Sequence, residues 1–324
     1  MDKKPIIPPV DKELLKAELL PELMLRKTNR AGNEIYVLTA QQAPNVLREI
    51  GRLREIAFRD GGGGTGEELD LDKFDLNPAY GYRQLVLWDP DEEVIVGGYR
   101  FVLCDEAMYD VHGQPILTSS HMFTFSKKFL KEYIPSTIEL GRSFVSLEYQ
   151  STKENPKSIY ALDNLFDGLG ALMILTAGRM KYFFGKMTIY PDYPAEGLDM
   201  IMYFLKKYFG GRHGSLVKIG KPLKVKDSSK WKKLFSGKDY KENYKILNTE
   251  IRKLGVNIPP LVNSYMNLSP SMKYLGTGVN DEFGDVLDSG ILIAFDDLYP
   301  EKTRRHVESI KAGLSHFMRW VKKL

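Results

Sequence analysis

The chain has 324 residues, of which 43% are hydrophobic and 27% are charged, and its formal net charge is +4. This balance is typical of a folded globular protein and excludes wholesale disorder, while a single cysteine, Cys104, excludes an intramolecular disulfide and a cysteine-based zinc site. The longest nearly uncharged apolar stretch, residues 169–178, is about half the length of a membrane span, and the start of the chain lacks a signal-like apolar segment. We therefore expect a cytoplasmic protein that does not cross a membrane.

The first half of the chain is expected to begin with helices and continue as a hairpin. Residues 1–40 predict a Pro-rich start and a helical extension that is broken or restarted at Pro21. Residues 41–58 carry an apolar stripe typical of a helix, which ends before four glycines, residues 61–64, expected to form a mobile loop. Residues 84–88 and 94–103 predict a β-hairpin, because the turn chemistry of Asp89-Pro90-Asp91 separates them.

The second half predicts strands alternating with helices. Strands are expected at 123–125, 138–147, 182–190 and 290–295, and helices at 158–180, 195–208, 240–254 and 301–324. A hairpin meander followed by strand–helix–strand predicts an α+β fold with a mixed central sheet and flanking helices. The final helix, residues 301–324, has one apolar stripe surrounded by basic residues, so it either packs on the domain or lies on an anionic membrane surface.

The charges are segregated along the sequence. Residues 60–110 hold 13 Asp/Glu against 3 Lys/Arg, a net of −10, whereas residues 206–245, which begin at Lys206 and end at Lys245, hold 13 Lys/Arg against 3 Asp/Glu, a net of +10. We call these the acidic segment and the basic block. The basic block suggests a negatively charged partner: an acidic protein, a phosphate-rich ligand or an anionic membrane. Nucleic acid is not expected, since the block has no recognisable nucleic-acid-binding signature.

The strand around residues 138–147 carries the clearest candidates for chemistry. None of the five histidines falls at metal-ligand spacing, and we expect neither a metal site nor a Ser or Cys nucleophile. Glu139 and Arg142 would face opposite sides of a regular strand, but a bulge at Gly141 would bring them to one side. They then suit a general base beside an anion clamp. The alternative is a solvent-facing carboxylate and a surface arginine.

Several motifs in order give the chain a family resemblance. They include Val96-Gly97-Gly98-Tyr99-Arg100, Glu139-Leu140-Gly141-Arg142-Ser143-Phe144-Val145, and stretches at 53–59, 64–75, 165–168, 182–185 and 258–268. Together they resemble the GNAT acyltransferase superfamily. The resemblance is closest to its hemolysin-like branch, the ornithine-lipid and glycine-lipid N-acyltransferases related to acyl-homoserine-lactone synthases. One departure is Asp167, where the branch usually has a basic residue.

The resemblance implies a GNAT-like domain over residues 41–300 and a set of site residues. Two strands should splay apart and admit a pantetheine arm, which pairs with open backbone groups. Glu139 would act as the base, the N–H of Phe144 or Val145 would stabilise the oxyanion, and Arg142 and Arg100 would clamp a carboxylate or orient Glu139. Substrate contacts are expected from Tyr99, Phe183 and Tyr190, and donor contacts from Lys157, Gly168 and Gly170. Those two glycines could instead be helix–sheet packing points.

The resemblance also implies the two substrates. The acceptor is expected to be a small amino acid such as glycine or ornithine, in aminolipid biosynthesis. The donor is a long acyl chain on acyl carrier protein, whose acidic surface suits the basic block, or acyl-CoA; no tightly bound cofactor is expected. Two alternatives stay open: an acetyl-CoA-dependent small-molecule N-acetyltransferase, and a non-catalytic lipid-binding or membrane-active protein. A peripheral location at the inner face of the membrane is also possible.

Overall fold

The protein is built on one eight-stranded sheet in a computed structural model that describes residues 3–150, 155–211 and 216–313. The strand order is β1-β2-β3-β4-β6-β7-β10-β9. All neighbouring pairs run antiparallel except β6 and β7. The strands are β1 (Met24–Lys27), β2 (Glu34–Leu38), β3 (Arg83–Asp89), β4 (Val94–Leu103), β6 (Thr137–Val145), β7 (Tyr182–Ile189), β9 (Lys273–Asn280) and β10 (Val286–Ala294). A small second sheet pairs β5 (Phe123–Phe125) with β8 (Val217–Ile219).

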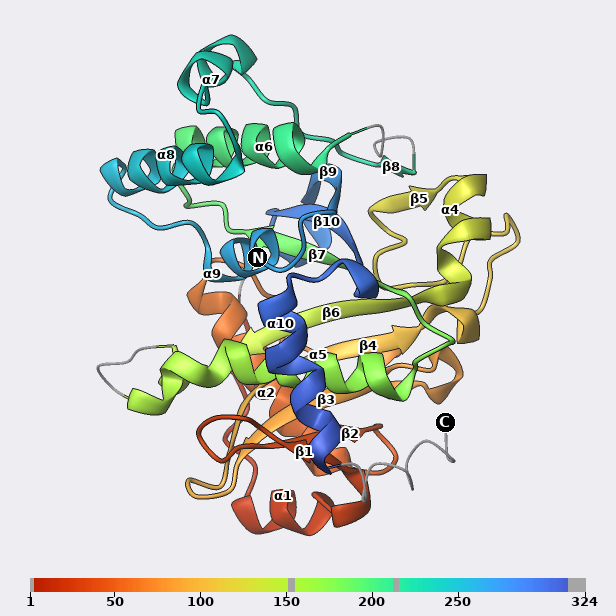
Figure 1. The fold of residues 1–324 in the computed structure, drawn as a ribbon. Helices are drawn as coiled ribbons and strands as arrows, with labels where there is room; N and C mark the ends of the chain where they lie inside the picture. The colour runs from red at the N-terminus through yellow and green to blue at the C-terminus, as the bar shows by residue number, and fades with distance from the viewer. Residues whose placement is uncertain (1–2, 151–154, 212–215, 314–324) are drawn as a thin grey trace.

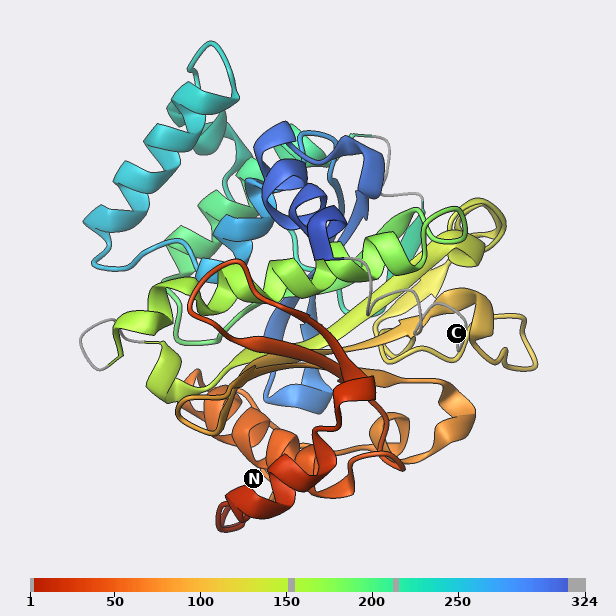
Figure 2. The same ribbon diagram turned by 60° about the horizontal axis from the view of Figure 1, so that its bottom comes forward.

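Helices cover both faces of this sheet (Figures 1 and 2). One face packs α1 (Lys12–Glu18) and α2 (Pro44–Asp60), and the other packs α5 (Ala161–Leu175), α6 (Ala195–Phe209), α8 (Tyr240–Lys253) and α9 (Pro260–Met266). The shorter helices are α3 (Lys73–Leu76), α4 (Lys127–Glu132), α7 (Ser228–Leu234) and α10 (Pro300–His306). The α+β fold with a mixed sheet and flanking helices is therefore confirmed.

The N-terminal region differs from the helical extension expected for residues 1–40. Only α1 is α-helical there, and β1 and β2 form the edge of the main sheet. The apolar residues after Pro21 suggest another helical turn, but Met24–Lys27 form β1, which pairs with β2. Strand β2 in turn pairs with β3 over five residues, from Glu34↔Trp88 to Leu38↔Gln84. Long-range strand pairing thus determines the secondary structure of this segment, which is too short for its own hydrophobic periodicity to be informative.

The central pair β6 and β7 separates, as expected of a splayed strand pair. Parallel pairing covers only Thr137↔Tyr182, Ile138↔Phe183 and Glu139↔Phe184, although both strands continue beyond these pairs. On its other side β6 stays paired with β4 through Gly97↔Val145. One edge of β6 therefore faces an opening from Leu140 onward.

A bulge in β6 lies where the sequence suggests one. Between the pairs Arg100↔Gly141 and Gly98↔Phe144, β6 contributes one residue more than β4. Arg142, inside the bulge, has a φ of +48°. This left-handed conformation is uncommon for a residue with a side chain and persists only where the surroundings hold it. The bulge re-aims the side chain of Arg142.

Helix α5 is a core helix. The helical stretch Pro156–Leu175 is long and apolar enough to cross a membrane by length and composition, and 61% of its most apolar window is buried inside the protein. A Cβ at Gly168 would lie 2.8 Å from the Leu85 side chain, and one at Gly170 would lie 2.0 Å from the carbonyl oxygen of His306. These two glycines let α5 approach the sheet and α10 closely.

The C-terminal helix expected at residues 301–324 is shorter in the described part of the chain. After α10, residues Glu308–Gly313 form 3-10 turns, and residues 314–324 lie outside the described residues. The α10 end packs on α5, where His306 Nδ1 lies 2.8 Å from Asp167 Oδ1.

Candidate active site

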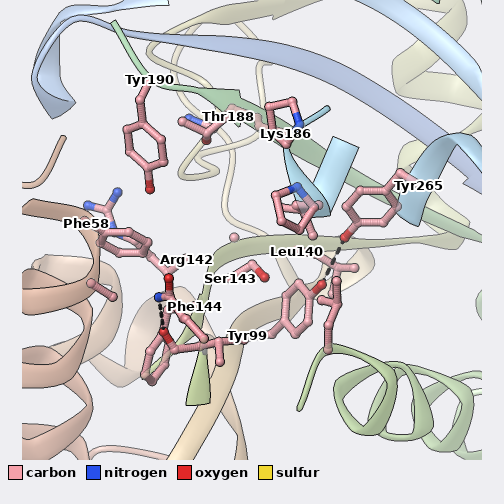
Figure 3. Close-up of a pocket in the computed structure, with 18 of the residues that line it drawn as sticks. Phe58, Tyr99, Leu140, Arg142, Ser143, Phe144, Lys186, Thr188, Tyr190 and Tyr265 are labelled. Carbon is pink, nitrogen blue, oxygen red and sulfur yellow. Dashed lines mark hydrogen bonds between the residues drawn. The ribbon is translucent and has the colours of Figure 1, made fainter. Parts of the chain in front are cut away.

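A cavity of about 380 Å³ fills the opening between β6 and β7. Figure 3 shows Leu140, Arg142 and Ser143 of β6 along one wall, with Lys186 and Thr188 of β7 on the other. Further lining comes from α2, α5 and α9. The cavity is lined by Phe58 from the α2 face and by Tyr265 from the α9 face, so both faces of the sheet contribute to this opening, which we call the slot.

Five of the expected site residues line this slot: Tyr99, Arg142, Phe144, Val145 and Tyr190. Tyr99 Oη lies 3.3 Å from Tyr265 Oη. Burial raises the pKa of Tyr190 to about 12, so this hydroxyl is protonated at neutral pH. Phe183, in contrast, is buried among core residues and is not among the residues that line the slot.

The glycine loop at residues 61–64, which the sequence analysis expects to be mobile, packs against Tyr190. A Cβ on Gly61 would lie 2.6 Å from Tyr190 Cζ, and one on Gly63 would lie 3.1 Å from Tyr190 Cε1. The run of glycines therefore allows the backbone to approach the tyrosine ring.

Arg142 lines the slot, but its charge is already compensated. Its Nε lies 2.9 Å from Asp70 Oδ2, its Nη2 lies 3.8 Å from Asp72 Oδ2, and the guanidinium lies 4.3 Å from the centre of the Phe283 ring. Asp70 is fully buried, and its oxygens accept no well-aligned hydrogen bond from the described residues. Burial raises the pKa of Asp70 against the opposing effect of Arg142.

Arg100 lies away from the slot, in a buried ion cluster formed with Arg54, Asp72 and Asp75. Arg100 Nη1 is 2.7 Å from both Asp72 Oδ1 and Asp75 Oδ2, and Arg54 Nη1 is 3.0 Å from Asp75 Oδ1. Burial alone would raise the pKa of Asp75, but the two arginines outweigh it and hold that pKa below its ordinary value. Arg100 therefore stabilises the acidic segment behind β6 and is not among the residues that line the slot.

Glu139 is also buried outside the slot, with 1% of its surface exposed. It accepts hydrogen bonds from the Tyr82 hydroxyl, from Thr118 Oγ1 at 3.1 Å and from the Ser119 N–H at 3.0 Å. Burial and the adjacent carboxylate raise the pKa of Tyr82 well above 10, so Tyr82 stays a donor. The structure thus places Glu139 as an anchor for residues 118–119, with no direct contact to the slot.

The slot contains a polar wall that the sequence analysis did not identify, formed by Lys186, Thr188, Asn280 and Asp288. Lys186 Nζ lies 2.9 Å from Asp288 Oδ2, while Thr188 Oγ1 donates to Asp288 Oδ1 at 2.6 Å and Asn280 Nδ2 donates to Oδ2 at 2.8 Å. Burial opposes ionisation of Asp288, but Lys186 and these donors lower its pKa. The signal for this wall in the sequence was weak: Lys186 and Thr188 alternate with apolar residues in β7, and Asp288 interrupts the apolar sequence of β10.

The residues expected to contact the donor have structural partners. Lys157 Nζ lies 3.0 Å from Asp89 Oδ2 and 2.9 Å from Asp91 Oδ2. Gly168 and Gly170 are buried packing points, as described above. Asp167, the departure from the family pattern, accepts hydrogen bonds from the Asn29 backbone N–H at 2.8 Å and faces His306, so it ties α5 to the β1–β2 loop and to α10. None of Lys157, Asp167, Gly168 and Gly170 lines the slot.

The basic block lies at the surface. In residues 206–211 and 216–245 its lysines are all exposed: Lys206, Lys207, Lys218, Lys221, Lys224, Lys226, Lys230, Lys232, Lys233, Lys238, Lys241 and Lys245. Among these, Lys221 pairs with Asp281 and Lys230 pairs with Glu196. The block runs through the end of α6, α7 and the first part of α8, which lie together on one side of the molecule (Figure 1) and precede α9, whose Pro260 and Leu261 line the slot.

The slot can hold an extended ligand beside an open strand edge and offers a charged wall next to it. Among the described residues, no group of three or more His, Cys, Asp or Glu side chains is arranged to hold a metal ion. The arrangement suits a reaction between two substrates that enter from opposite faces of the sheet.

Comparison with known proteins agrees with this geometry. Residues 53–155 match the acetyltransferase (GNAT) domain family. A glycine N(alpha)-acyltransferase of Phocaeicola vulgatus is 56% identical over 94% of this chain and 93% of its own length. One of the same name from Bacteroides thetaiotaomicron is 56% identical over 94% of this chain and 90% of its own. No solved structure matches. The chain is therefore an enzyme that belongs to the GNAT superfamily of N-acyltransferases.

Proposed function

We propose that this enzyme transfers a long-chain acyl group from acyl carrier protein to the α-amine of glycine, forming an N-acylglycine for aminolipid synthesis in the cytoplasm. The observation that supports this proposal most directly is the slot, in which an open edge of β6 faces a charged wall on β7 and β10. The names of the two relatives support glycine as the acceptor. The resemblance to the glycine-lipid branch supports the lipid pathway.

The two ends of the slot suit the two substrates. The face that carries α5 and α9 contributes apolar side chains, including Leu140, Leu162 and Leu261, which suit the donor's acyl chain and pantetheine arm. The open edge of β6 can pair with pantetheine amides in the manner of strand addition. The opposite face contributes the polar wall and suits a small, charged acceptor.

The proposed chemistry is direct transfer without a covalent enzyme intermediate. The neutral amine attacks the thioester carbonyl carbon, and a backbone N–H at Phe144 or Val145 stabilises the oxyanion. The tetrahedral intermediate then collapses as the C–S bond breaks. The departing thiolate gains a proton and the nitrogen loses one, so the products are an amide and a thiol. Tyr190, protonated at neutral pH, is placed to donate to the thiolate.

The proposed donor is a carrier protein because the lysines of the basic block are exposed and the block directly precedes α9, which lines the slot. A lysine-rich surface attracts an acidic protein and raises the rate of encounter. Coenzyme A has no extended acidic surface and would gain less from a block of this size.

The test is a reconstituted assay with purified enzyme. Acyl carrier proteins loaded with acetyl to palmitoyl chains, and the matching acyl-CoAs, are each offered with glycine or ornithine, and the amides are identified by mass spectrometry. The proposal expects N-acylglycine, with long chains and the carrier protein preferred. Preference for acetyl-CoA would replace it with a small-molecule N-acetyltransferase, and ornithine products would change the acceptor.

A further inference from the structure

The polar wall gives the slot a cation with spare hydrogen-bonding capacity. Of the described residues that line the slot, three carry a full charge: Arg142, Lys186 and Asp288. Arg142 already faces two carboxylates, at 2.9 Å and 3.8 Å, and lies over the Phe283 ring. It therefore has little free capacity for an additional anion.

Asp288 is held by donors on both of its oxygens. Thr188 lies directly opposite Asp288 in the β7–β10 register and donates to Oδ1. Asn280 donates to Oδ2, and the other end of its amide is fixed because His121 Nε2 lies 3.1 Å from Asn280 Oδ1. Since both carboxylate oxygens are engaged and folding lowers the pKa, Asp288 is a fixed anion and a poor proton acceptor.

Lys186 is the member of the wall with free donors. Its ammonium has three N–H groups. Among the described residues, its polar partners are Asp288 Oδ2 at 2.9 Å and the thioether sulfur of Met122 at 3.7 Å. A thioether is a weak acceptor, and 18% of the Lys186 side chain is exposed where the slot is lined. An ammonium held by one carboxylate can still bind another anion as a point charge.

We propose that Lys186 binds the carboxylate of the amino-acid acceptor, and that Asp288, Thr188 and Asn280 are positioning residues that hold the Lys186 ammonium at the polar end of the slot. This inference rests on the proposed function, because it assumes an acceptor that carries both an amine and a carboxylate. It makes the enzyme selective for zwitterionic amino acids over simple amines. It also moves the carboxylate contact from Arg142 and Arg100 to the opposite wall.

The aromatic side chains at this end support a small acceptor. Phe58 and Phe283 pack edge to face with ring centres 5.0 Å apart, and Tyr190 is held by the glycine loop. Tyr190 lies beside Thr188 of the polar wall (Figure 3), and all three rings line the slot, so we expect them to limit the size of the acceptor side chain.

The test compares glycine with glycinamide, which keeps the amine and lacks the negative charge. A soluble acyl-pantetheine thioester serves as donor, so that carrier-protein docking does not enter. The wild type is expected to prefer glycine. Lys186→Met is expected to raise KM for glycine roughly 10- to 100-fold, the range of a lost charge-assisted hydrogen bond, and to leave glycinamide nearly unchanged. Lys181→Met, an exposed lysine just before β7, is the matched control and should change neither.

Two further variants separate binding from folding. Lys186→Met leaves Asp288 without its cation, so the double variant Lys186→Met/Asp288→Asn removes both charges and should show the same loss of preference for glycine. Lys186→Arg keeps the charge and should retain part of the preference. Equal losses of kcat/KM for glycine and glycinamide would overturn the inference, because Lys186 would then act on the donor. Unchanged values for both would make it a scaffold residue.

Direct titration without donor distinguishes this inference from the proposed function. A wild type that binds glycine more tightly than glycinamide, loses that difference in Lys186→Met, and yet makes no N-acylglycine would overturn the proposed function alone. A Lys186→Met enzyme that makes N-acylglycine with undiminished preference for glycine would overturn the inference alone.

Discussion

The acidic segment and the basic block carry opposite net charges in sequence, and they differ in how many of their charged side chains are buried. In the acidic segment, Asp70, Asp75 and Asp89 are almost fully buried and face Arg142, Arg100 and Lys157 respectively. In the basic block, each described lysine is exposed to solvent. A sum of charges over a segment therefore does not indicate where the protein has an electrostatic surface.

The difference follows from where counterions come from. The three buried carboxylates are matched by arginines on α2, β4 and β6 and by Lys157, so this part of the acidic segment is neutralised inside the protein, while its other acidic residues stay at least partly exposed. Burying such charges is tolerated only when partners and hydrogen bonds compensate for lost solvation. Most lysines of the block stay hydrated, and their electric field extends into solvent, so the block is suited to recognition. The buried carboxylates of the acidic segment are suited to stabilising the fold.

The largest expected effect comes from breaking the buried ion cluster. Arg100→Met would leave Asp75 and Asp72 short of a cation, and removing one partner of a buried pair typically costs about 3–5 kcal/mol of unfolding free energy. Arg83→Met is the matched control, since Arg83 lies in the same segment and its pair with Glu106 at 3.1 Å is partly exposed. That change should cost less than about 1 kcal/mol. Urea unfolding measures both, and equal costs would show that burial does not separate the two classes of pair.

The pH dependence of stability should separate Asp75 from Asp70. Folding lowers the pKa of Asp75 from its ordinary 3.8, so its stabilising contribution is present at neutral pH and is lost as the pH falls below about 4. The unfolding free energies of wild type and Asp75→Asn should therefore differ by a constant amount from neutral pH down to about pH 5 and converge as the pH falls below about 4. Burial raises the pKa of Asp70, so the difference between wild type and Asp70→Asn should change with the opposite sign. Parallel curves for either variant would contradict the assignment.

Glu139→Gln is expected to reduce stability more than chemistry. The change replaces one carboxylate oxygen, an acceptor, by an NH2 group, a donor. Because three donors point at Glu139, at least one of them would then face another donor in a buried site, which should cost about 1–3 kcal/mol of unfolding free energy. Turnover per folded molecule should fall less than about tenfold, compared with about 100- to 10,000-fold for a lost general base. A thermal melt and active-site-normalised kcat measure the two. A large loss of kcat with an unchanged melt would restore Glu139 as the base, acting through water.

Glu139 also illustrates how far the sequence could predict the site. The family resemblance implied the splayed strand pair that the structure shows. The motif suggested a bulge at Gly141 that would bring Glu139 and Arg142 to one side; β6 does bulge, at Arg142 and Ser143, but Glu139 stays outside the slot that Arg142 lines. The motif could not predict that Tyr82 and Thr118 would enclose the carboxylate, since neither is near Glu139 in sequence. The same limit hid the polar wall: Thr188 and Asp288 meet only through β7–β10 pairing, 100 residues apart.

The smallest expected effect, and the one that tests the exposed side of the comparison, concerns the basic block. Reversing Lys226, Lys232 and Lys233 to glutamate should lower kcat/KM for acyl carrier protein roughly tenfold at low salt, because steering acts on encounter. The effect should shrink as salt rises, since the screening length falls to about 8 Å at physiological ionic strength. The rate at saturating donor should stay nearly constant.

The matched control reverses Lys127, Lys128 and Lys131, exposed lysines on α4 outside the block. It changes net charge equally, so an equal loss of rate would mean that only total charge matters. Acyl-pantetheine has no acidic surface and should react at wild-type rates with both triple variants. If it reacts slowly with the basic-block variant, the block supports the fold or the acceptor site. If only binding to anionic vesicles is weakened, the block serves a membrane surface. A salt-sensitive loss seen with the carrier protein alone would show that the exposed charges act on the encounter with the donor protein, before the slot is entered.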